Sequence, residues 1–243
     1  MFCALKGATL IPRREMARQS PVTINDLPAS ELVPATRKPA TGVESRPPRL
    51  HPRAVVEVTE TIVHLVRHGE STWNRERRIQ GQTADIPLTA LGFAQARIAT
   101  DVLRGRVSGP AVLWSSDLLR ARQTAQVIGD TLGIAARFDR DLREQFLGEM
   151  EGQLVRDLVP EPTPEGQHAA EVRWAGGESL HDVFIRVHGA FARILRGAPH
   201  HVLVVSHGDT LRVASALLNG RGHRDVDAEV PGNGTVTSIP LSR

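Results

Sequence analysis

Three short apolar runs, each followed by a cluster of polar residues, constrain the fold of this chain more than any other feature. The runs are Thr61–Val66, Ala111–Trp114 and His201–Val205, and their apolar composition, rich in β-branched residues, is typical of buried strands. The stretches between them carry apolar residues every three or four positions, as amphipathic helices do. Strands that alternate with helices predict an α/β fold with a largely parallel sheet.

The ends of the expected helices can also be assigned. Thr89 is expected to cap a helix with Leu91, Ala94, Ile98 and Leu103 among its apolar positions. Asp117 is expected to cap a second helix, which Gly133 ends. The other elements are expected at residues 135–138 (strand), 179–195 (helix), 210–218 (helix) and 234–239 (strand), with a loop-rich segment over about 140–178. Together they predict a three-layer αβα sandwich with a mostly parallel central sheet.

Residues 1–58 differ from the rest of the chain. Half of the 16 prolines lie before residue 53, and no helical or alternating apolar pattern runs through this stretch. We therefore expect a disordered extension over residues 1–58 and one folded domain over residues 59–243. Whether translation starts at Met1 or at Met16 stays open.

The positive charge of the chain belongs to that extension. Residues 1–60 hold 9 Lys and Arg against 6 Asp and Glu, so they account for the whole net charge of +3. Basic residues can bind nucleic acid or acidic membranes, but here they are scattered, which favours a solvated tail. A nucleic-acid role is not expected; it would predict salt-dependent binding that is lost with residues 1–58.

Cysteine content and hydropathy indicate the compartment. The single cysteine, Cys3, rules out an internal disulfide framework and a cysteine-rich metal site. No apolar run approaches the roughly 18 residues that a membrane span needs. Arg13 and Arg14 resemble a twin-arginine signal, yet no hydrophobic stretch follows them. These features favour a cytoplasmic protein that does not associate with membranes.

The polar clusters come directly after the expected strands. They are Arg67-His68-Gly69-Glu70, Ser115-Ser116-Asp117 with Arg120, and Ser206-His207-Gly208. In parallel α/β sheets, ligands bind just beyond the carboxyl ends of the strands. If these strands are neighbours, two histidines and two arginines converge on one pocket. Such a pocket offers cationic forks for phosphate oxygens and an imidazole that can attack phosphorus.

The clusters belong to a longer series of motifs. Six blocks occur in order between residues 62 and 239: Leu65–Asn74, Gln80–Ala96, Ser115–Ala125, Leu142–Gly152, Gly176–Ser179 and Val205–Gly208. In kind, spacing and order they resemble the histidine phosphatase superfamily, the group that includes cofactor-dependent phosphoglycerate mutases. The resemblance covers nearly the whole expected domain and implies the phosphoglycerate mutase-like fold.

The residue types suit phosphoryl transfer, which depends on positioning and on neutralising charge. His68 is expected to attack phosphorus as a neutral imidazole, so that neither a metal ion nor a cofactor is needed. Arg67 and Arg120 would hold the non-bridging oxygens, and His207 would add a hydrogen bond from the opposite side. Glu144 would protonate the leaving alkoxide and then activate water, which requires a raised pKa.

Two sets of residues extend this assignment. Carboxylates close to Glu144 in the sequence compete for the role of the acid: Asp139, Asp141, Glu149 and Glu151. The resemblance further implies a set that binds the phosphate of the substrate: Gly69, Ser71, Asn74, Gln80, Gly81 and Gly208.

The sequence does not favour a metal site or a nucleotide-binding motif. His64 and His68 are four residues apart, but on a strand this spacing provides no helical face for a metal pair. The chain lacks the phosphate-binding Gly-x-x-x-x-Gly-Lys loop and the dinucleotide glycine fingerprint. His200 and His201 are expected in a solvated turn.

The reaction type follows from the length of one segment. Phosphoglycerate mutases that the chain resembles carry a longer insertion after the acid block and a C-terminal tail over the site, whereas about 24 residues separate Gly152 from Gly177 here. We therefore expect a metal-independent phosphomonoesterase that acts on a small phosphorylated metabolite. A phosphoglycerate mutase and a silent binder of phosphorylated ligands remain alternatives. The oligomeric state stays open, a homodimer being one option.

Overall fold

The computed structural model describes residues 60–159 and 161–242, so the expected extension over residues 1–58 lies outside the described residues and stays a prediction. Within the described ranges, five strands form one sheet in the order β3-β2-β4-β1-β5. Strands β1 to β4 run parallel, and β5 pairs antiparallel with β1 at the edge. Their bounds are β1 (Glu60–Arg67), β2 (Ala111–Ser115), β3 (Ala136–Phe138), β4 (His201–Ser206) and β5 (Val236–Ser242).

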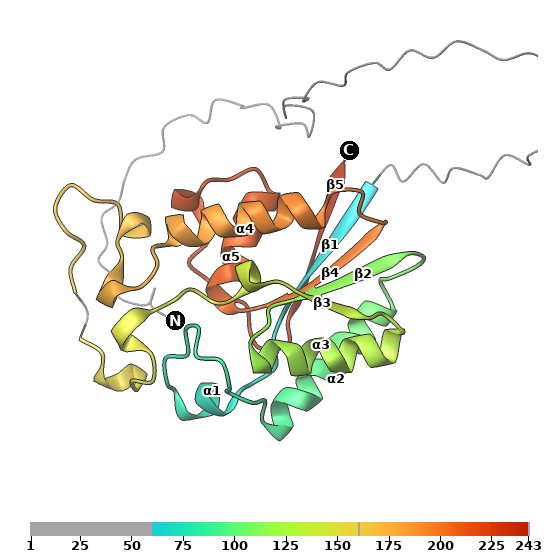
Figure 1. The fold of residues 1–243 in the computed structure, drawn as a ribbon, viewed down its shortest axis with the longest axis horizontal. Helices are drawn as coiled ribbons and strands as arrows, with labels where there is room; N and C mark the ends of the chain where they lie inside the picture. The colour runs from blue at the N-terminus through green and yellow to red at the C-terminus, as the bar shows by residue number, and fades with distance from the viewer. Residues whose placement is uncertain (1–59, 160, 243) are drawn as a thin grey trace, which may run out of the picture.

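Helices cover both faces of the sheet, as Figure 1 shows. Helices α2 (Ala90–Arg104) and α3 (Leu119–Leu132) pack on one face, and α4 (Leu180–Ile194) and α5 (Gly208–Leu218) on the other. The predicted three-layer αβα sandwich is therefore confirmed. The shorter helices are α1 (Thr72–Glu76), η1 (Arg140–Leu142), η2 (Gly148–Met150), η3 (Val155–Asp157), η4 (Ala169–Glu171), η5 (Trp174–Gly176) and η6 (His223–Asp225).

The central strands alternate between two buried faces. In β4, Val202 and Val204 join the core beneath α4 and α5, whereas Leu203 and Val205 join the core beneath α2 and α3. Successive side chains on a strand point to opposite faces, so a strand covered on both sides needs an unbroken apolar run. This is the pattern by which the strand was predicted.

The helix caps confirm most of the expected boundaries. The side chains of Thr89 and Ser179 accept hydrogen bonds from backbone N–H groups in the first turns of α2 and α4. The predicted cap at Asp117 is wrong: α3 begins one residue later, with Leu118 as its N-cap and no side-chain bond. The Asp117 carboxylate instead accepts two hydrogen bonds of 2.6 Å from Arg143. A charge-assisted fork of this kind is stronger than a capping bond to one amide.

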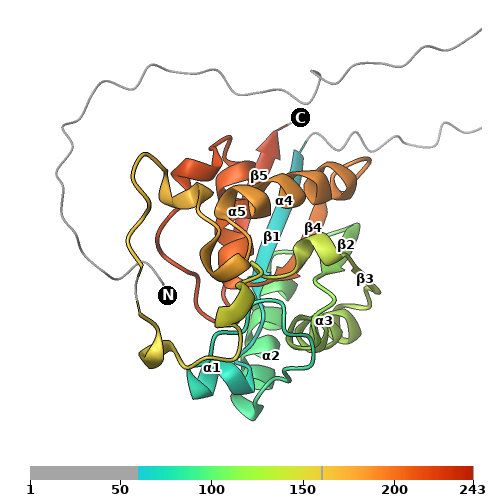
Figure 2. The same ribbon diagram turned by 60° about the vertical axis from the view of Figure 1, so that its left-hand side comes forward.

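The loop-rich segment gathers at one end of the sheet. Figure 2 shows α1 beside the part of the segment that carries η2 and η3, and a bridge between Arg78, just beyond α1, and Leu154 joins the two. This is the end at which the parallel strands terminate. None of the helices in the described part of the chain is long and apolar enough to cross a membrane.

A buried histidine pair, His64 and His201, lies on the sheet face that α2 and α3 cover, away from the carboxyl ends of the strands. His201 is 1% exposed, so its predicted place in a solvated turn is wrong. Its Nε2 accepts a hydrogen bond from the backbone N–H of Ser108, and its Nδ1 lies 3.0 Å from Nε2 of His64. His64 Nδ1 in turn lies 2.8 Å from Oγ of Ser238. The chain of bonds holds both rings neutral, each with its proton on Nδ1.

This pair should make folding stability depend on pH. Burial, with the nearby charges of His201, Arg106 and His200, lowers the pKa of His64 to about 4. Because the unfolded chain keeps the ordinary value of about 6.5, it binds more protons between these two values. The contribution of neutral His64 to the free energy of unfolding is therefore complete above pH 6.5. It falls by about 3 kcal/mol as the pH drops towards 4.

Urea unfolding at neutral and acid pH tests this expectation. Wild type should lose about 3 kcal/mol more between pH 7 and pH 4 than His64→Gln, whose amide cannot be protonated in this range. His188→Gln, at an exposed position of α4, is the control and should keep the wild-type dependence. Equal pH dependence of wild type and His64→Gln would contradict the assignment.

Candidate active site

The three polar clusters meet at adjacent strand ends, as the sequence predicts. In the sheet, β4 lies between β1 and β2, so the residues that follow these strands share one edge. His68 follows β1, Ser116 follows β2 and His207 follows β4. The order of strands reverses here, because α2 and α3 carry the chain outward from β1 and α4 returns it to the middle. Such a switch point is the usual place for a ligand crevice.

His68 is buried and its ring has a defined orientation. Its Nδ1 donates a hydrogen bond of 2.7 Å to the carbonyl oxygen of Gly69. A neutral imidazole with its proton on Nδ1 has a lone pair on Nε2. Burial, with the charges of Arg120 and Arg67, lowers the pKa of His68 well below its ordinary value. The ring is therefore neutral near pH 7, with an unprotonated Nε2, and its role as the nucleophile stays a proposal.

His207 lies next to His68 and marks the start of α5. The ring centroids of the two histidines are 5.0 Å apart, in an edge-on arrangement. His207 Nε2 lies 2.8 Å from the Oγ atom of Ser116, and its buried Nδ1 has no partner among the described residues. Burial first, then the charge of Arg120, lowers its pKa well below the ordinary value. Nδ1 can therefore form a hydrogen bond with a ligand, as the donor to an oxygen when protonated or as the acceptor of a proton when not.

Two arginines supply positive charge to the same edge. Arg67 donates from Nη1 to the carbonyl oxygen of Pro231 at 2.6 Å. Arg120, fully buried in the first turn of α3, donates to the carbonyl oxygens of Gly81 and Thr83 at 2.7 and 2.9 Å. Burial lowers the pKa of Arg120 to about 10, and it has no carboxylate within salt-bridge distance among the described residues. The carboxylates of Glu144 and Glu151 attract this charge without a direct salt bridge, so an anion in the site would supply a counter-charge in contact.

Unpartnered polar atoms concentrate in this site. Within residues 60–159 and 161–242, four buried side-chain nitrogens lack a hydrogen-bond partner. Three of them belong to the site: Nε of Arg67, Nε of Arg120 and Nδ1 of His207. Buried polar groups without partners cost roughly 1–3 kcal/mol each, so a native structure keeps them where a ligand can bind. A phosphate, with its several acceptor oxygens, fits this set.

Glu144 lies at the N-terminus of α5. Its carboxylate accepts hydrogen bonds from the backbone N–H groups of Asp209 and Thr210 at 3.3 and 3.2 Å. A Cβ atom added to Gly208 would lie 3.6 Å from Glu144 Oε2 and 3.7 Å from Cζ of Arg67, so these groups meet around that glycine. Burial, then the charge of Asp209, raises the pKa of Glu144. A carboxyl group with a raised pKa can hold a proton for a leaving group.

The competing carboxylates are occupied elsewhere. Asp139 and Asp141 both form salt bridges with Arg193 at the surface, and Glu149 is exposed. Glu151 accepts hydrogen bonds from the backbone N–H of Gln82 and from the hydroxyl of Thr83. It thereby orders the loop whose carbonyl groups bind Arg120. Glu144 is thus the member of this set that the fold brings to the strand ends, and its role as the acid stays a proposal.

Most of the predicted phosphate-binding residues lie around the site as supports. Ser71 is fully buried, and its hydroxyl lies 2.7 Å from Oε1 of Gln80 and 3.0 Å from Oδ1 of Asn74, either of which can accept its proton. Asn74 closes a capping box with Ser71 at the start of α1. Gly81 binds Arg120 through its carbonyl oxygen. Direct contact of these side chains with a phosphate stays a prediction.

The two glycines have different positions. The backbone N–H of Gly69 donates to Oγ1 of Thr124, and a Cβ atom at Gly69 would lie 2.1 Å from the carbonyl oxygen of Gly92. Gly69 is therefore required for the close approach of the His68 loop to α2. Gly208 is the first residue of α5, where backbone N–H groups have no partner within the helix. Its amide is the better placed of the two to bind an anion.

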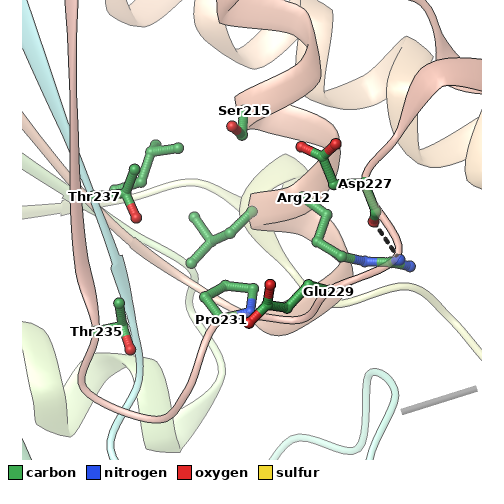
Figure 3. Close-up of a pocket in the computed structure, with 9 residues that line it drawn as sticks. Arg212, Ser215, Asp227, Glu229, Pro231, Thr235 and Thr237 are labelled. Carbon is green, nitrogen blue, oxygen red and sulfur yellow. Dashed lines mark hydrogen bonds between the residues drawn. The ribbon is translucent and has the colours of Figure 1, made fainter. Parts of the chain in front are cut away.

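A loop that the sequence did not single out forms one wall of the site. Val230 lies against Gly208, Pro231 accepts the hydrogen bond of Arg67, and Asn233 donates to the carbonyl oxygen of His68. Arg212 donates a hydrogen bond to the carbonyl oxygen of Asp227 at the start of this loop. With Pro231 and Thr235 it lines a hollow of about 310 Å³ (Figure 3). The Pro-Gly-Asn-Gly run from residue 231 indicates a turn but carries no sign of its partners.

No group of three or more His, Cys, Asp or Glu side chains within the described residues is placed to hold a metal ion. The site residues provide nitrogen donors for an anion in place of such a set.

Comparison with known proteins points to one family. Residues 63–243 match the family described as the histidine phosphatase superfamily (branch 1). A curated relative, the probable phosphoglycerate mutase GpmB of Salmonella paratyphi C, is 42% identical over 165 residues, which are 65% of this chain and 74% of that protein.

Solved structures share both the fold and part of the sequence. A mycobacterial glucosyl-3-phosphoglycerate phosphatase in complex with VO3 is 31% identical, with a TM-score of 0.64 over 73% of this chain and 92% of its own. A putative alpha-ribazole-5'-P phosphatase from Escherichia coli is 27% identical, with a TM-score of 0.63 over 75% of this chain and 91% of its own. The fold predicted from the motifs is that of these proteins.

Proposed function

The chain belongs to the histidine phosphatase superfamily (branch 1), and on that basis we propose that it is a metal-independent phosphomonoesterase acting on a small phosphorylated metabolite. The observation that carries the proposal is the set of unpartnered nitrogens on Arg67, Arg120 and His207 beside the free Nε2 of His68. Unpartnered nitrogens, two of them on cationic side chains, around a neutral nucleophile match the needs of phosphoryl transfer. The two phosphatase structures support hydrolysis as the reaction.

In the first step, the lone pair on His68 Nε2 attacks phosphorus and forms a nitrogen–phosphorus bond. The bond from phosphorus to the ester oxygen breaks, and its electron pair stays on that oxygen, which takes the proton of Glu144. In the second step, the Glu144 carboxylate removes a proton from water as the water oxygen attacks phosphorus. The nitrogen–phosphorus bond breaks, its electrons return to Nε2, and inorganic phosphate leaves.

The other groups stabilise charge in both steps. Arg67 and Arg120 would bind the non-bridging oxygens through their unpartnered Nε–H groups. His207, neutral in the free enzyme, would share a proton with an oxygen through Nδ1. Because a neutral imidazole is already a competent nucleophile, the chemistry needs no metal ion to generate one.

A phosphoglycerate mutase is the second candidate, and the name of the GpmB relative favours it. A mutase must keep water away from the phosphohistidine until the phosphoryl group returns to the second oxygen of the product. Hydrolysis and exchange can therefore be separated by where the phosphoryl group goes.

The test is a panel of phosphomonoesters with EDTA present, including phosphorylated sugars and sugar acids. Hydrolysis predicts release of inorganic phosphate from part of the panel. The mutase predicts exchange between 3- and 2-phosphoglycerate, primed by the bisphosphorylated compound, with little phosphate release. If neither reaction occurs and no labelled phosphoenzyme forms with any compound, the silent-binder alternative replaces both.

The activity should fall as pH rises. Glu144 must be protonated to donate to the leaving oxygen, so kcat/KM for an alkyl phosphate falls once pH passes its pKa. That pKa is raised by burial and by the charge of Asp209. Asp209→Asn removes this charge, which lowers the pKa of Glu144 and moves the descending limb to lower pH. Glu149→Gln, at an exposed position, is the control, and an unmoved limb in Asp209→Asn would contradict the assignment.

A further inference from the structure

Glu144 stands in a stretch of chain that no regular element holds. Helix η1 ends at Leu142, and the next short helix, η2, begins at Gly148. The residues between them have no ladder of backbone hydrogen bonds like that of a helix or strand. A general acid must nevertheless lie within hydrogen-bond reach of the leaving oxygen, with its orientation fixed. Side chains from other elements have to supply that order.

Arg186, on α4, donates five hydrogen bonds, three to backbone carbonyl oxygens of residues 141–144 and two to the carboxylate of Glu178. Its Nη1 donates to the carbonyl oxygens of Asp141 and Arg143, both at 2.8 Å, and its Nη2 to that of Glu144 at 2.9 Å. Nε and Nη2 also donate to the two carboxylate oxygens of Glu178, at 2.8 and 3.0 Å. A guanidinium has five N–H donors, so every donor of Arg186 is used.

Glu178 binds the chain on the other side of Glu144, and we call the Arg186–Glu178 pair the clamp. Its carboxylate accepts a bond of 2.9 Å from the backbone N–H of Phe146. The Arg186 and Glu178 side chains are 15% and 22% exposed. An ion pair this buried contributes little net stability, because desolvation offsets the attraction between the charges. Its geometry, which binds the chain on both sides of Glu144, points to a role in positioning.

Arg193 provides a natural contrast on the same helix. It lies seven residues beyond Arg186 and binds the same part of the chain, through salt bridges to the carboxylates of Asp139 and Asp141. Its side chain is 49% exposed, and it makes no contact with the backbone of Glu144 among the described residues. One arginine of α4 therefore holds the backbone that carries the acid, while the other holds surface carboxylates.

We propose that Arg186, together with Glu178, is a positioning residue that orients Glu144 for proton donation to the leaving group. The inference rests on the proposed role of Glu144 as the acid. Arg186 acts through the backbone of residues 141–144 and does not touch the reacting atoms. Loss of the clamp removes one of the lesser charges that lower the pKa of His207. It should leave His68 and the arginines of the site in place and act mainly on proton donation.

The leaving group provides the readout. A strongly basic alkoxide cannot depart without a proton, whereas a nitrophenolate departs readily without one. The parameter kcat/KM includes the departure of the leaving group and excludes the later hydrolysis of the phosphohistidine. It is therefore measured with an alkyl phosphate, glycerol phosphate, and with 4-nitrophenyl phosphate, for each variant.

Arg186→Gln should lower kcat/KM for glycerol phosphate by roughly 10- to 100-fold and that for 4-nitrophenyl phosphate by less than about threefold. Glu144→Gln should show the same selectivity, with a loss of roughly 10²- to 10⁴-fold on the alkyl ester. The double variant should be no worse than Glu144→Gln, because the clamp acts through that residue. Arg193→Gln should leave both substrates near wild-type values.

The outcomes separate the inference from the function on which it rests. An equal loss on both substrates, or no loss on either, in Arg186→Gln beside a selective Glu144→Gln would overturn the positioning role alone. A Glu144→Gln variant without selectivity would remove the acid itself and the proposal with it.

Two further variants keep the test decisive if Arg186→Gln does not fold. Arg186→Lys keeps the positive charge but offers one point charge in place of a fork, and it should show an intermediate, still selective loss. Glu178→Gln keeps the shape of the partner and should also be selective. Non-selective losses in both would overturn the proposal.

Discussion

His68→Ala should abolish phosphate release, with kcat lowered by roughly 10⁴-fold or more. The expectation follows from the covalent step: without Nε2 there is no atom to accept the phosphoryl group, and the remaining groups can only bind it. Transition-state charge stabilisation by Arg67, Arg120 and His207 would leave a small residual rate. Binding of inorganic phosphate should persist, because its donors remain.

The measurement combines turnover with trapping of the intermediate. Wild type incubated with a radiolabelled phosphomonoester and rapidly quenched should carry label, and His68→Ala should carry none. His68→Asn is the second variant, because an amide can still donate to the carbonyl oxygen of Gly69 and keep the loop folded. His188→Ala, on the exposed surface of α4, is the control and should match wild type. Label on His68→Ala would place the nucleophile elsewhere.

Arg120→Met should lower kcat/KM by roughly 10³-fold while leaving the stability of the free protein within about 1 kcal/mol of wild type. Arg120 is fully buried and has no carboxylate partner within salt-bridge distance, and burial lowers its pKa to about 10. Folding therefore bears a cost for this charge, of about 3 kcal/mol. The apolar side chain removes the cost, which offsets the lost bonds to the carbonyl oxygens of Gly81 and Thr83.

The effect of inorganic phosphate on Tm separates a loss of anion binding in Arg120→Met from a loss of folding stability. A ligand at 100 times its Kd stabilises the folded state by about 2.7 kcal/mol, so phosphate should raise the Tm of wild type. It should raise that of Arg120→Met little or not at all. Arg122→Met, two residues on in the same helix and exposed, is the control and should respond as wild type does. A variant strongly destabilised without phosphate would show that Arg120 is mainly a structural residue.

The sequence predicts the local elements well because their causes are local. An unbroken apolar run marks β4 because both of its faces are covered, and Thr89 marks the start of α2 because its hydroxyl binds an amide three residues on. Asp117 fails by the same logic. Its carboxylate could accept a hydrogen bond from a nearby backbone amide or from Arg143, which is distant in the sequence. Only the fold shows that Arg143 is close enough to bind it.

The identity of the general acid also depends partly on sequence and partly on contacts that only the fold creates. Five carboxylates between residues 139 and 151 are close in the sequence, and only the resemblance of the Leu142–Gly152 block to the family motif favours Glu144 over the others. The fold separates them, since α5 presents its N-terminus to Glu144. Arg193 binds Asp139 and Asp141, the loop at Gln82 binds Glu151, and Glu149 is exposed. Arg186 is a further case, because a helical arginine 42 residues beyond Glu144 has no local sign of its partner.

The sequence by itself thus determined the order of strands and helices, the polar cluster at each strand end and the family that these motifs resemble. These follow from propensity, periodicity and motif order, which a chain carries whatever its final shape. Only the tertiary structure decided which strand ends are adjacent, which of the competing carboxylates are held away from them, and how Pro231 and Arg186 support the site. Such contacts join residues far apart in the chain, and their free energy depends on burial and distance, which exist only once the chain has folded.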